Sequence, residues 1–377
     1  MARSWAWGLC WLLASLPAAW AGTEPRATAD TWPMWRGDAA QSGRSPSILP
    51  TTLVPKWRAR TGDAIVAGAV VDATQVYVGS KDGVIRAFDR RTGRVRWSVT
   101  TEAPVEAPGL RVGAWLVIGS RDHRLRALGA ADGRAAWTVD LGSEIVGGAA
   151  WVPADGAPES VVVGDYAGTL HRVDLATGRE VWRYETGNYI YGSPAISQGH
   201  AIFGGCDGYV HAVRVSDGVA VRKAEVGAYV GASVALAGDT AFTGHFGNRV
   251  VGIDWRRGAV RWSHFDRSFP YLSSPALTDD VVILGGRDHV VRALSRDKGE
   301  AWWMFPVAEK VDASPVVAGG RAVVGASDGR LYVLDLEDGH AVQTVDLGSG
   351  VVAGAAVASG WVWVGTEDGV LHALGPG

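Results

Sequence analysis

Cysteine is almost absent from this chain of 377 residues, which contains only Cys10 and Cys206. Cys10 lies in an N-terminal segment that we expect to be removed, so the mature chain keeps a single thiol. This excludes an intramolecular disulfide and the paired cysteines of structural zinc sites. We expect Cys206 to be a small buried thiol, because no histidine or basic residue lies near it in the sequence.

A strong net charge is lacking as well. The 36 lysines and arginines nearly balance the 39 aspartates and glutamates, giving −3, and loss of Arg3 would give −4. Without a long basic run the chain has no electrostatic footprint of a nucleic-acid binder. We therefore expect no nucleic-acid partner.

Long apolar runs are missing beyond residues 1–21. These residues combine Arg3, an apolar run from Trp5 to Leu16, Pro17 and an Ala19-Trp20-Ala21 ending. This pattern is typical of a secretory signal peptide, and the run is too short for a membrane helix. We expect cleavage after Ala21, export to a periplasm or the extracellular space, and no lipid anchor, because no cysteine follows the cleavage point.

Motifs of common catalytic sites are also missing: there is no Gly-x-Ser-x-Gly elbow, phosphate-binding loop or dinucleotide fingerprint. His171, His211 and His372 share one position of a repeat, so symmetry places them in different repeats rather than around one ion. His245, His264 and His289 follow no metal-ligand spacing, and we expect them at the surface. The sequence predicts no catalytic residue, metal site or cofactor site.

What the chain has is a repeat. A β-rich run ending in glycine, an Asp-Gly turn, a second β-rich run and a Thr-Gly-like turn recur, with copies starting at Gly79, Gly119, Gly164, Gly204, Gly244, Gly285, Gly325 and Gly365. A period of about 40 residues with short strands is typical of four-stranded propeller blades. The sequence predicts an all-β, eight-bladed β-propeller.

The last copy stops before its outermost strand, and the segment around Trp57 fits that missing place. We expect the N-terminal strand to pair with the C-terminal blade and close the ring, which removes open sheet edges. The expected organisation is a signal peptide at 1–21, a lead-in segment at 22–50 and one propeller domain at 51–377.

A tryptophan ends most copies. Arg222 and Gln343 replace it in two copies, and we interpret the tryptophans as wedges between neighbouring blades: Trp57, Trp97, Trp137, Trp182, Trp262 and Trp303. A position repeated around a ring favours packing over cofactor binding.

The repeated sequence resembles the pyrroloquinoline-quinone enzyme repeat. The resemblance is strongest in Ala87-Phe88-Asp89 through Trp97 and in Val173-Asp174 through Trp182. The opening Trp32-Pro33-Met34-Trp35-Arg36-Gly37-Asp38 resembles the lead-in of exported proteins with such repeats. A WD-repeat interpretation fits poorly, because no Trp-Asp dipeptide ends the copies. The resemblance implies two branches: quinone-dependent dehydrogenases, and non-catalytic propellers similar to the propeller subunit of the outer-membrane β-barrel assembly machinery.

The dehydrogenase branch implies pyrroloquinoline quinone, a calcium or lanthanide ion held by a Glu, Asn and Asp set, an Asp base and often a vicinal cysteine pair. Here Cys206 stands alone and the copies are close to minimal length. Glu106, Glu144, Asn188 and Asp312 are the nearest approach to a ligand set, but they come from different blades. We expect no cofactor, with quinone and calcium as the alternative.

The segment before each innermost strand should face the central channel, where ligands and peptides dock in propellers. Its varying positions give an aromatic sector flanked by charge: Glu106, Glu144, Tyr189, Tyr191, Tyr229, Phe269, Tyr271, Lys310 and Asp312. We interpret them as a candidate docking site for a protein or peptide at the funnel mouth. The alternative is that these tyrosines plug the channel and pack on one another.

The expected function is therefore an exported, non-catalytic protein-binding scaffold in cell-envelope or outer-membrane protein assembly, monomeric by itself. The alternative is a quinoprotein oxidoreductase or a propeller that binds a small ligand.

Overall fold

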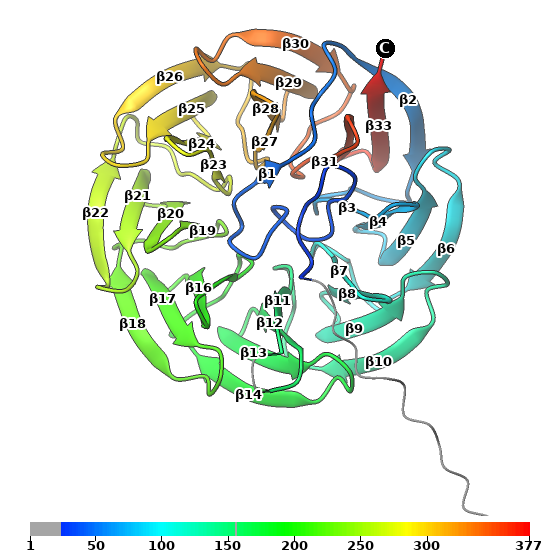
Figure 1. Cartoon of the computed structure of the whole chain (residues 1–377), viewed down its shortest axis with the longest axis vertical. Helices are drawn as coiled ribbons and strands as arrows, with labels where there is room; N and C mark the ends of the chain where they lie inside the picture. Colours follow the sequence, from blue (N-terminus) through cyan, green and yellow to red (C-terminus); the bar gives the residue numbers. More distant parts are fainter. Residues whose placement is uncertain (1–23, 155–156) are drawn as a thin grey trace, which may run out of the picture.

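A computed structural model describes residues 24–154 and 157–377, and these residues form eight β-sheets arranged as a ring (Figure 1). The expected signal peptide and its cleavage point lie outside the described residues. Each sheet contains one blade, and in blades 1 to 7 the strands follow one another in chain order from the innermost to the outermost. No helix of the described residues is long and apolar enough to cross a membrane. The prediction of an all-β, eight-bladed propeller is confirmed.

The blades follow one another in chain order. Blades 1 to 4 comprise β3 (Val70–Val71), β4 (Gln75–Gly79), β5 (Val84–Asp89), β6 (Val95–Thr100); β7 (Leu110–Val112), β8 (Trp115–Gly119), β9 (Arg124–Gly129), β10 (Ala135–Asp140); β11 (Ala150–Val152), β12 (Ser160–Gly164), β13 (Thr169–Asp174), β14 (Glu180–Glu185); and β15 (Ala195–Ser197), β16 (His200–Gly204), β17 (Tyr209–Arg214), β18 (Ala220–Glu225). Blades 5 to 8 comprise β19 (Ala235–Ala237), β20 (Thr240–His245), β21 (Arg249–Asp254), β22 (Ala259–His264); β23 (Ala276–Leu277), β24 (Val281–Gly285), β25 (Val290–Ser295), β26 (Ala301–Pro306); β27 (Val316–Ala318), β28 (Arg321–Gly325), β29 (Arg330–Asp335), β30 (Ala341–Asp346); and β31 (Ala356–Ala358), β32 (Trp361–Gly365), β33 (Val370–Pro376) with β2 (Leu53–Arg60).

The ring closes through blade 8, whose outermost strand comes from the start of the chain. β2 pairs antiparallel with β33, from Leu53 opposite Pro376 to Arg60 opposite Val370. In Figure 1 the blue β2 lies beside the red β33. The predicted closure by the N-terminal strand is confirmed, and this pairing removes the free edge of β33.

Six tryptophans join neighbouring blades in the same way. Each indole Nε1 donates to a backbone carbonyl of the next blade at 2.8–3.0 Å: Trp57 to Arg90, Trp97 to Ala130, Trp137 to Leu175, Trp182 to Val215, Trp262 to Arg296 and Trp303 to Leu336. The rings pack on the glycine of the next blade's Thr-Gly-like turn: a Cβ on Gly339 would lie 2.5 Å from the Trp303 ring. That glycine also has a φ of 78°. Positive φ and the contact with an indole thus both require glycine there.

Two blades use other side chains in this slot. Gln343 binds both backbone groups of Leu53, its Nε2 donating at 2.7 Å and its Oε1 accepting at 2.8 Å. Arg222 is exposed, and the buried Trp255 lies in the apolar cluster shared by blades 4 and 5. The blade contacts therefore differ in chemistry around the ring.

The lead-in segment crosses the ring on one side and adds β1 (Arg44–Ser45), which pairs in parallel with β27 (Figure 1). Its carbonyls accept hydrogen bonds from backbone N–H groups of seven blades: those of Val71, Arg111, Ile196, Leu236, Leu277, Val317 and Ser359. Blade 3 instead shares an apolar cluster with Met34 through Trp151. The lead-in is thus an inner belt that satisfies the free edges of the innermost strands.

In three blades the aspartate of the tight turn forms an ion pair with the arginine four residues later: Asp82 with Arg86, Asp122 with Arg126 and Asp288 with Arg292. Burial alone would raise the pKa of Asp82, but hydrogen bonds from Arg86, Ser80 and the Gly62 amide outweigh it and bring the pKa down to about 2. A carboxyl whose pKa falls on folding contributes stability above its unfolded pKa, and loses it as pH drops toward the folded pKa.

We therefore expect the advantage of the native protein over Asp82→Asn to be present at pH 7 and to disappear between about pH 4 and pH 2. The measurement is the urea unfolding midpoint of both proteins across this range. A stability difference that stays constant with pH would contradict the assignment.

Candidate functional site

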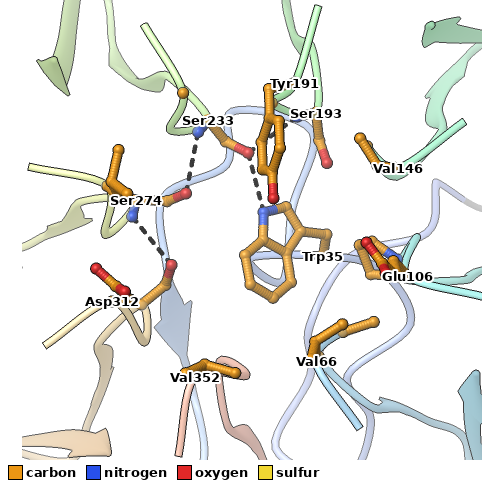
Figure 2. Close-up of a pocket in the computed structure, with 18 of the residues that line it drawn as sticks. Trp35, Val66, Glu106, Val146, Tyr191, Ser193, Ser233, Ser274, Asp312 and Val352 are labelled. Atoms are coloured by element: carbon orange, nitrogen blue, oxygen red, sulfur yellow. Dashed lines mark hydrogen bonds between the residues drawn. The ribbon is translucent and has the colours of Figure 1, made fainter. Parts of the chain in front are cut away.

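The central channel holds a cavity of about 770 Å³, and the lead-in crosses one end of the channel (Figure 1). The loop before blade 4 runs inward from Tyr189 at the mouth, past Tyr191, to Ser193. Trp35 of the lead-in and Ser193 both line the cavity, and the Trp35 Nε1 donates to Ser233 Oγ at 3.1 Å (Figure 2). The belt formed by the lead-in lies beyond it. We call this cavity the axial pocket, with Trp35 as its floor.

The sequence around Trp35 is adapted to this indole. A Cβ added to Gly68 would lie 2.4 Å from the Trp35 ring, and one added to Gly354 would lie 2.8 Å from it. Blades 4 to 7 carry serine at the corresponding place, as Ser193, Ser233, Ser274 and Ser314. Glycine in blades 1 and 8 gives room for the ring, and serine on the other side gives it a hydrogen-bond acceptor.

Exposed aromatic side chains gather at one arc of the mouth. Tyr189, Tyr191 and Tyr229 line the pocket and are 55%, 46% and 55% exposed. Tyr166 joins two of them, with ring centroids 5.3 Å from Tyr189 and 5.8 Å from Tyr191. Tyr229 instead contacts Phe246, with ring centroids 6.5 Å apart, and these side chains leave the cavity open. The structure therefore places these three sequence-derived candidates at an accessible mouth.

Charged groups at the mouth are paired. Arg121 binds Glu106 at 2.9 Å and also contacts Glu144, while Arg287 grips both carboxylate oxygens of Asp312 at 2.8 and 2.9 Å. Burial would lower the pKa of Arg121, but Glu106 outweighs it and raises that pKa. The carboxylates that line the pocket are thus already held by arginine.

Further candidates lie at the rim. Lys310 contacts Asp312 at 3.7 Å, and Phe269 is 48% exposed; neither lines the pocket.

Burial raises the pKa of the Tyr191 phenol, and the nearby Glu106 carboxylate adds to the effect. Its hydroxyl is therefore a neutral donor, directed toward Trp35 in Figure 2.

Tyr271 does not lie at the mouth, and this part of the expectation is wrong. Its side chain is 1% exposed and packs on Gly244, where a Cβ would lie 2.3 Å from the Tyr271 Cβ. The corresponding buried places in other blades hold Ile65, Val105 or Ile190 against Gly365, Gly79 and Gly164. The stretch from Gly244 to Gly285 is one residue longer than 40, so the alignment is shifted before blade 6, and Leu272 is the pocket residue.

Sequence reasoning missed two groups of pocket residues. One is Trp35, because the lead-in was only compared with similar segments of other exported proteins and was not assigned a position in the ring. The other is a ring of turn residues two positions after each repeat's first glycine, among them Lys81, Cys206, Phe246 and Arg287, which line the pocket. These residues differ from copy to copy, so the same search for variable positions, extended to the turns, would have found them.

The histidines differ in part from the expectation. His171 and His211 are buried within separate blades and contact Asp165 and Asp207, respectively. His245, expected at the surface, is 1% exposed, and burial lowers its pKa to about 4. His245 is the last residue of β20, and its Nδ1 accepts a hydrogen bond from Gly247 N at 3.0 Å.

The donor set of the described residues does not fit a calcium–quinone site. None of these residues forms a group of three or more His, Cys, Asp or Glu placed to hold a metal ion. Glu106 and Asp312 are bound by arginine, and Cys206 is a buried free thiol without a vicinal partner. Burial raises the pKa of that thiol, which disfavours the reactive thiolate.

Solved structures share this fold. BamB from Moraxella catarrhalis is 21% identical and superposes with a TM-score of 0.72 over 86% of this chain and 100% of its own. The quinohemoprotein alcohol dehydrogenase from Comamonas testosteroni is 14% identical, with a TM-score of 0.77 over 92% of this chain and 80% of its own. A quinohemoprotein alcohol dehydrogenase from Pseudomonas putida HK5 is also 14% identical, with a TM-score of 0.78 over 93% of this chain and 80% of its own. At these identities the likeness shows the fold alone.

No curated protein matches the sequence. A protein family does match, in three segments at residues 53–156, 121–270 and 268–376, which together cover the whole ring. The chain therefore belongs to the family described as outer membrane protein assembly factor BamB.

Proposed function

We propose that this protein is an exported, non-catalytic scaffold that binds a protein partner during cell-envelope or outer-membrane protein assembly, and that the partner docks at the mouth of the axial pocket. The observation that carries the proposal is the arc of exposed Tyr189, Tyr191, Tyr229 and Phe246 beside an open cavity. Exposed aromatic side chains around a pocket are typical anchors of protein interfaces, because they bury a large area at low entropic cost. The family's description supports the setting.

The paired charges suit docking rather than catalysis. Glu106, Glu144 and Asp312 are each engaged by arginine, so no carboxylate of this group is free to act as a base. Charged pairs around an aromatic centre form the polar rim that protein interfaces usually have.

We expect the double variant Tyr189→Ala/Tyr229→Ala to lose partner binding, with a cost of about 2 kcal/mol or more per anchor. Trp302→Ala is the matched control, since Trp302 is 56% exposed but lies on the outermost strand of blade 6. The measurement is quantitative capture from envelope extracts by the three purified proteins. Equal capture by all three would place docking elsewhere on the ring.

The alternative function is a quinoprotein oxidoreductase, and its test is independent of any partner. Calorimetric titration of the mature chain with pyrroloquinoline quinone and calcium, followed by a dye-linked assay with alcohols and sugars, measures it directly. Stoichiometric binding with turnover would overturn the scaffold proposal.

A further inference from the structure

The floor of the axial pocket carries serine hydroxyl groups that donate to no acceptor among the described residues. Ser193, Ser233, Ser274 and Ser314 line the pocket on four successive blades and are only 3–5% exposed. Each Oγ accepts from the backbone of the preceding blade: from Gly148 at 2.8 Å, and from Ser193, Ser233 and Ser274 at 3.0 Å each. We call these four residues the serine half-ring, and Figure 2 labels three of them, Ser193, Ser233 and Ser274.

Because the oxygens already accept, what remains is the hydroxyl proton. Ser233 shows this most clearly: its Oγ accepts from both Ser193 N and Trp35 Nε1, so both lone pairs are used. Within residues 24–154 and 157–377, none of these four hydroxyls donates to a protein acceptor. Buried donors at the end of a cavity call for a ligand with acceptor atoms.

A buried cation lies behind the same floor. Arg36 is 1% exposed, and its guanidinium carbon lies 5.8 Å from the centre of the Trp35 ring. Its Nη2 donates to the carbonyl of Pro275, the residue after Ser274, while its Nε has no partner. Burial lowers the pKa of Arg36 and the nearby Asp38 carboxylate opposes this effect, but none of the described carboxylates lies within ion-pair distance of the guanidinium. Where Arg36 is charged, it adds positive potential behind the floor.

The walls above the floor combine apolar side chains with charged side chains, and their two carboxylates, Glu106 and Asp312, are paired with arginine. Val66 and Val352 lie across the cavity from Tyr191, and Val146 lies beside Tyr191 on the neighbouring blade (Figure 2); Leu272 lies between blades 5 and 6. Glu106 and Asp312, which line the same cavity, are bound by Arg121 and Arg287. A ligand here would have an apolar or aromatic body with an acceptor-rich, negatively charged end.

We propose that the floor of the axial pocket binds a carboxylate carried on an apolar or aromatic body, with the serine half-ring donating to the carboxylate and the Trp35 indole packing on the body. This site does not depend on partner docking at the mouth. A carboxylate offers two oxygens with about four lone-pair directions, which matches several converging hydroxyl donors.

The first test uses the native protein and a matched pair of probes, N-acetyl-L-phenylalanine and its amide. They have the same body, and only the acid is charged. We expect the acid to bind at least about tenfold more tightly in calorimetry, since hydrogen bonds to a charged group are the stronger ones. Equal binding of acid and amide, or no heat from the acid at up to about 10 mM, would overturn the proposal.

The second test locates the site and identifies the kind of molecule that occupies it. Ser274→Ala/Ser314→Ala should weaken the acid by about tenfold and leave the amide unchanged, whereas Ser327→Ala, outside the pocket lining, should change neither. Acid binding that survives in the double variant would overturn the role of the half-ring. Tighter binding of a pentapeptide ending in phenylalanine than of N-acetyl-L-phenylalanine would support the end of a protein chain as occupant; equal binding would support a free organic acid. If the docking variant Tyr189→Ala/Tyr229→Ala loses partner capture but still binds the acid, this site and the docking site are separate.

Discussion

Replacing Trp303 with alanine is expected to lower the free energy of unfolding by about 3–5 kcal/mol. Trp303 is 7% exposed, lies on the Gly339 turn of blade 7 and donates to the Leu336 carbonyl at 2.9 Å. Truncation removes the wedge between blades 6 and 7 and leaves a cavity beside a glycine that cannot fill it. The measurement is the urea unfolding midpoint of the purified variant.

The adjacent residue is the control. Trp302 lies on the same strand, points the other way and is 56% exposed, so Trp302→Ala should cost less than about 1 kcal/mol. Gln343→Ala tests the same slot in blade 7, where two amide hydrogen bonds replace the indole, and should cost about 1–2 kcal/mol. Similar losses for Trp302→Ala and Trp303→Ala would show that blade contacts do not depend on the indole wedge.

The blades were predictable from sequence because each rule of the fold acts locally and recurs. A glycine such as Gly339 is needed both by the φ of its own turn and by the indole of the preceding blade. The turn, the strand that follows and the wedge therefore appear together about once every 40 residues. The closure of β33 by β2 was predictable for the same reason, since one copy lacks the strand that Trp57 supplies.

The site was less predictable, because it depends on exact alignment and on a non-repeated segment. One additional residue before blade 6 moves Tyr271 into a buried position that isoleucine or valine fills elsewhere, and puts Leu272 in the channel. The spacing of 41 residues from Gly244 to Gly285 shows that one residue is added, but not where it is added, because tyrosine and leucine are acceptable in both places.

Trp35 was missed for a different reason. The lead-in occurs once, so no internal comparison shows where it lies. Its only trace in the sequence is Gly68 and Gly354, opposite the serines of blades 4 to 7, and this difference has meaning only when the indole between them is known. Long-range packing of a single segment leaves no period to detect.

The second large effect is expected from a chain that begins at Arg44 and so lacks the inner belt. Seven backbone N–H groups, from Val71 in blade 1 to Ser359 in blade 8, would lose their acceptors. The buried side chains of Trp32 and Met34, 2% and 0% exposed, would leave the core as well. At about 1 kcal/mol for each hydrogen bond and about 2 kcal/mol for each side chain, the loss should exceed about 5 kcal/mol, a large part of a typical domain's stability.

The loss should also be local before it is global, because the outer strands keep their own ladders and indole wedges. Hydrogen exchange of the shortened chain should therefore show fast exchange at Ile196, Leu236 and Leu277 on the innermost strands, while the β5·β6 and β29·β30 pairs keep more protection. A shortened chain with unchanged exchange at these three amides would mean that the belt only covers the ring. If instead the amides of every strand lose their protection equally, the belt is needed for the propeller to close at all. The lead-in would then be part of the fold itself and not only the floor of the axial pocket.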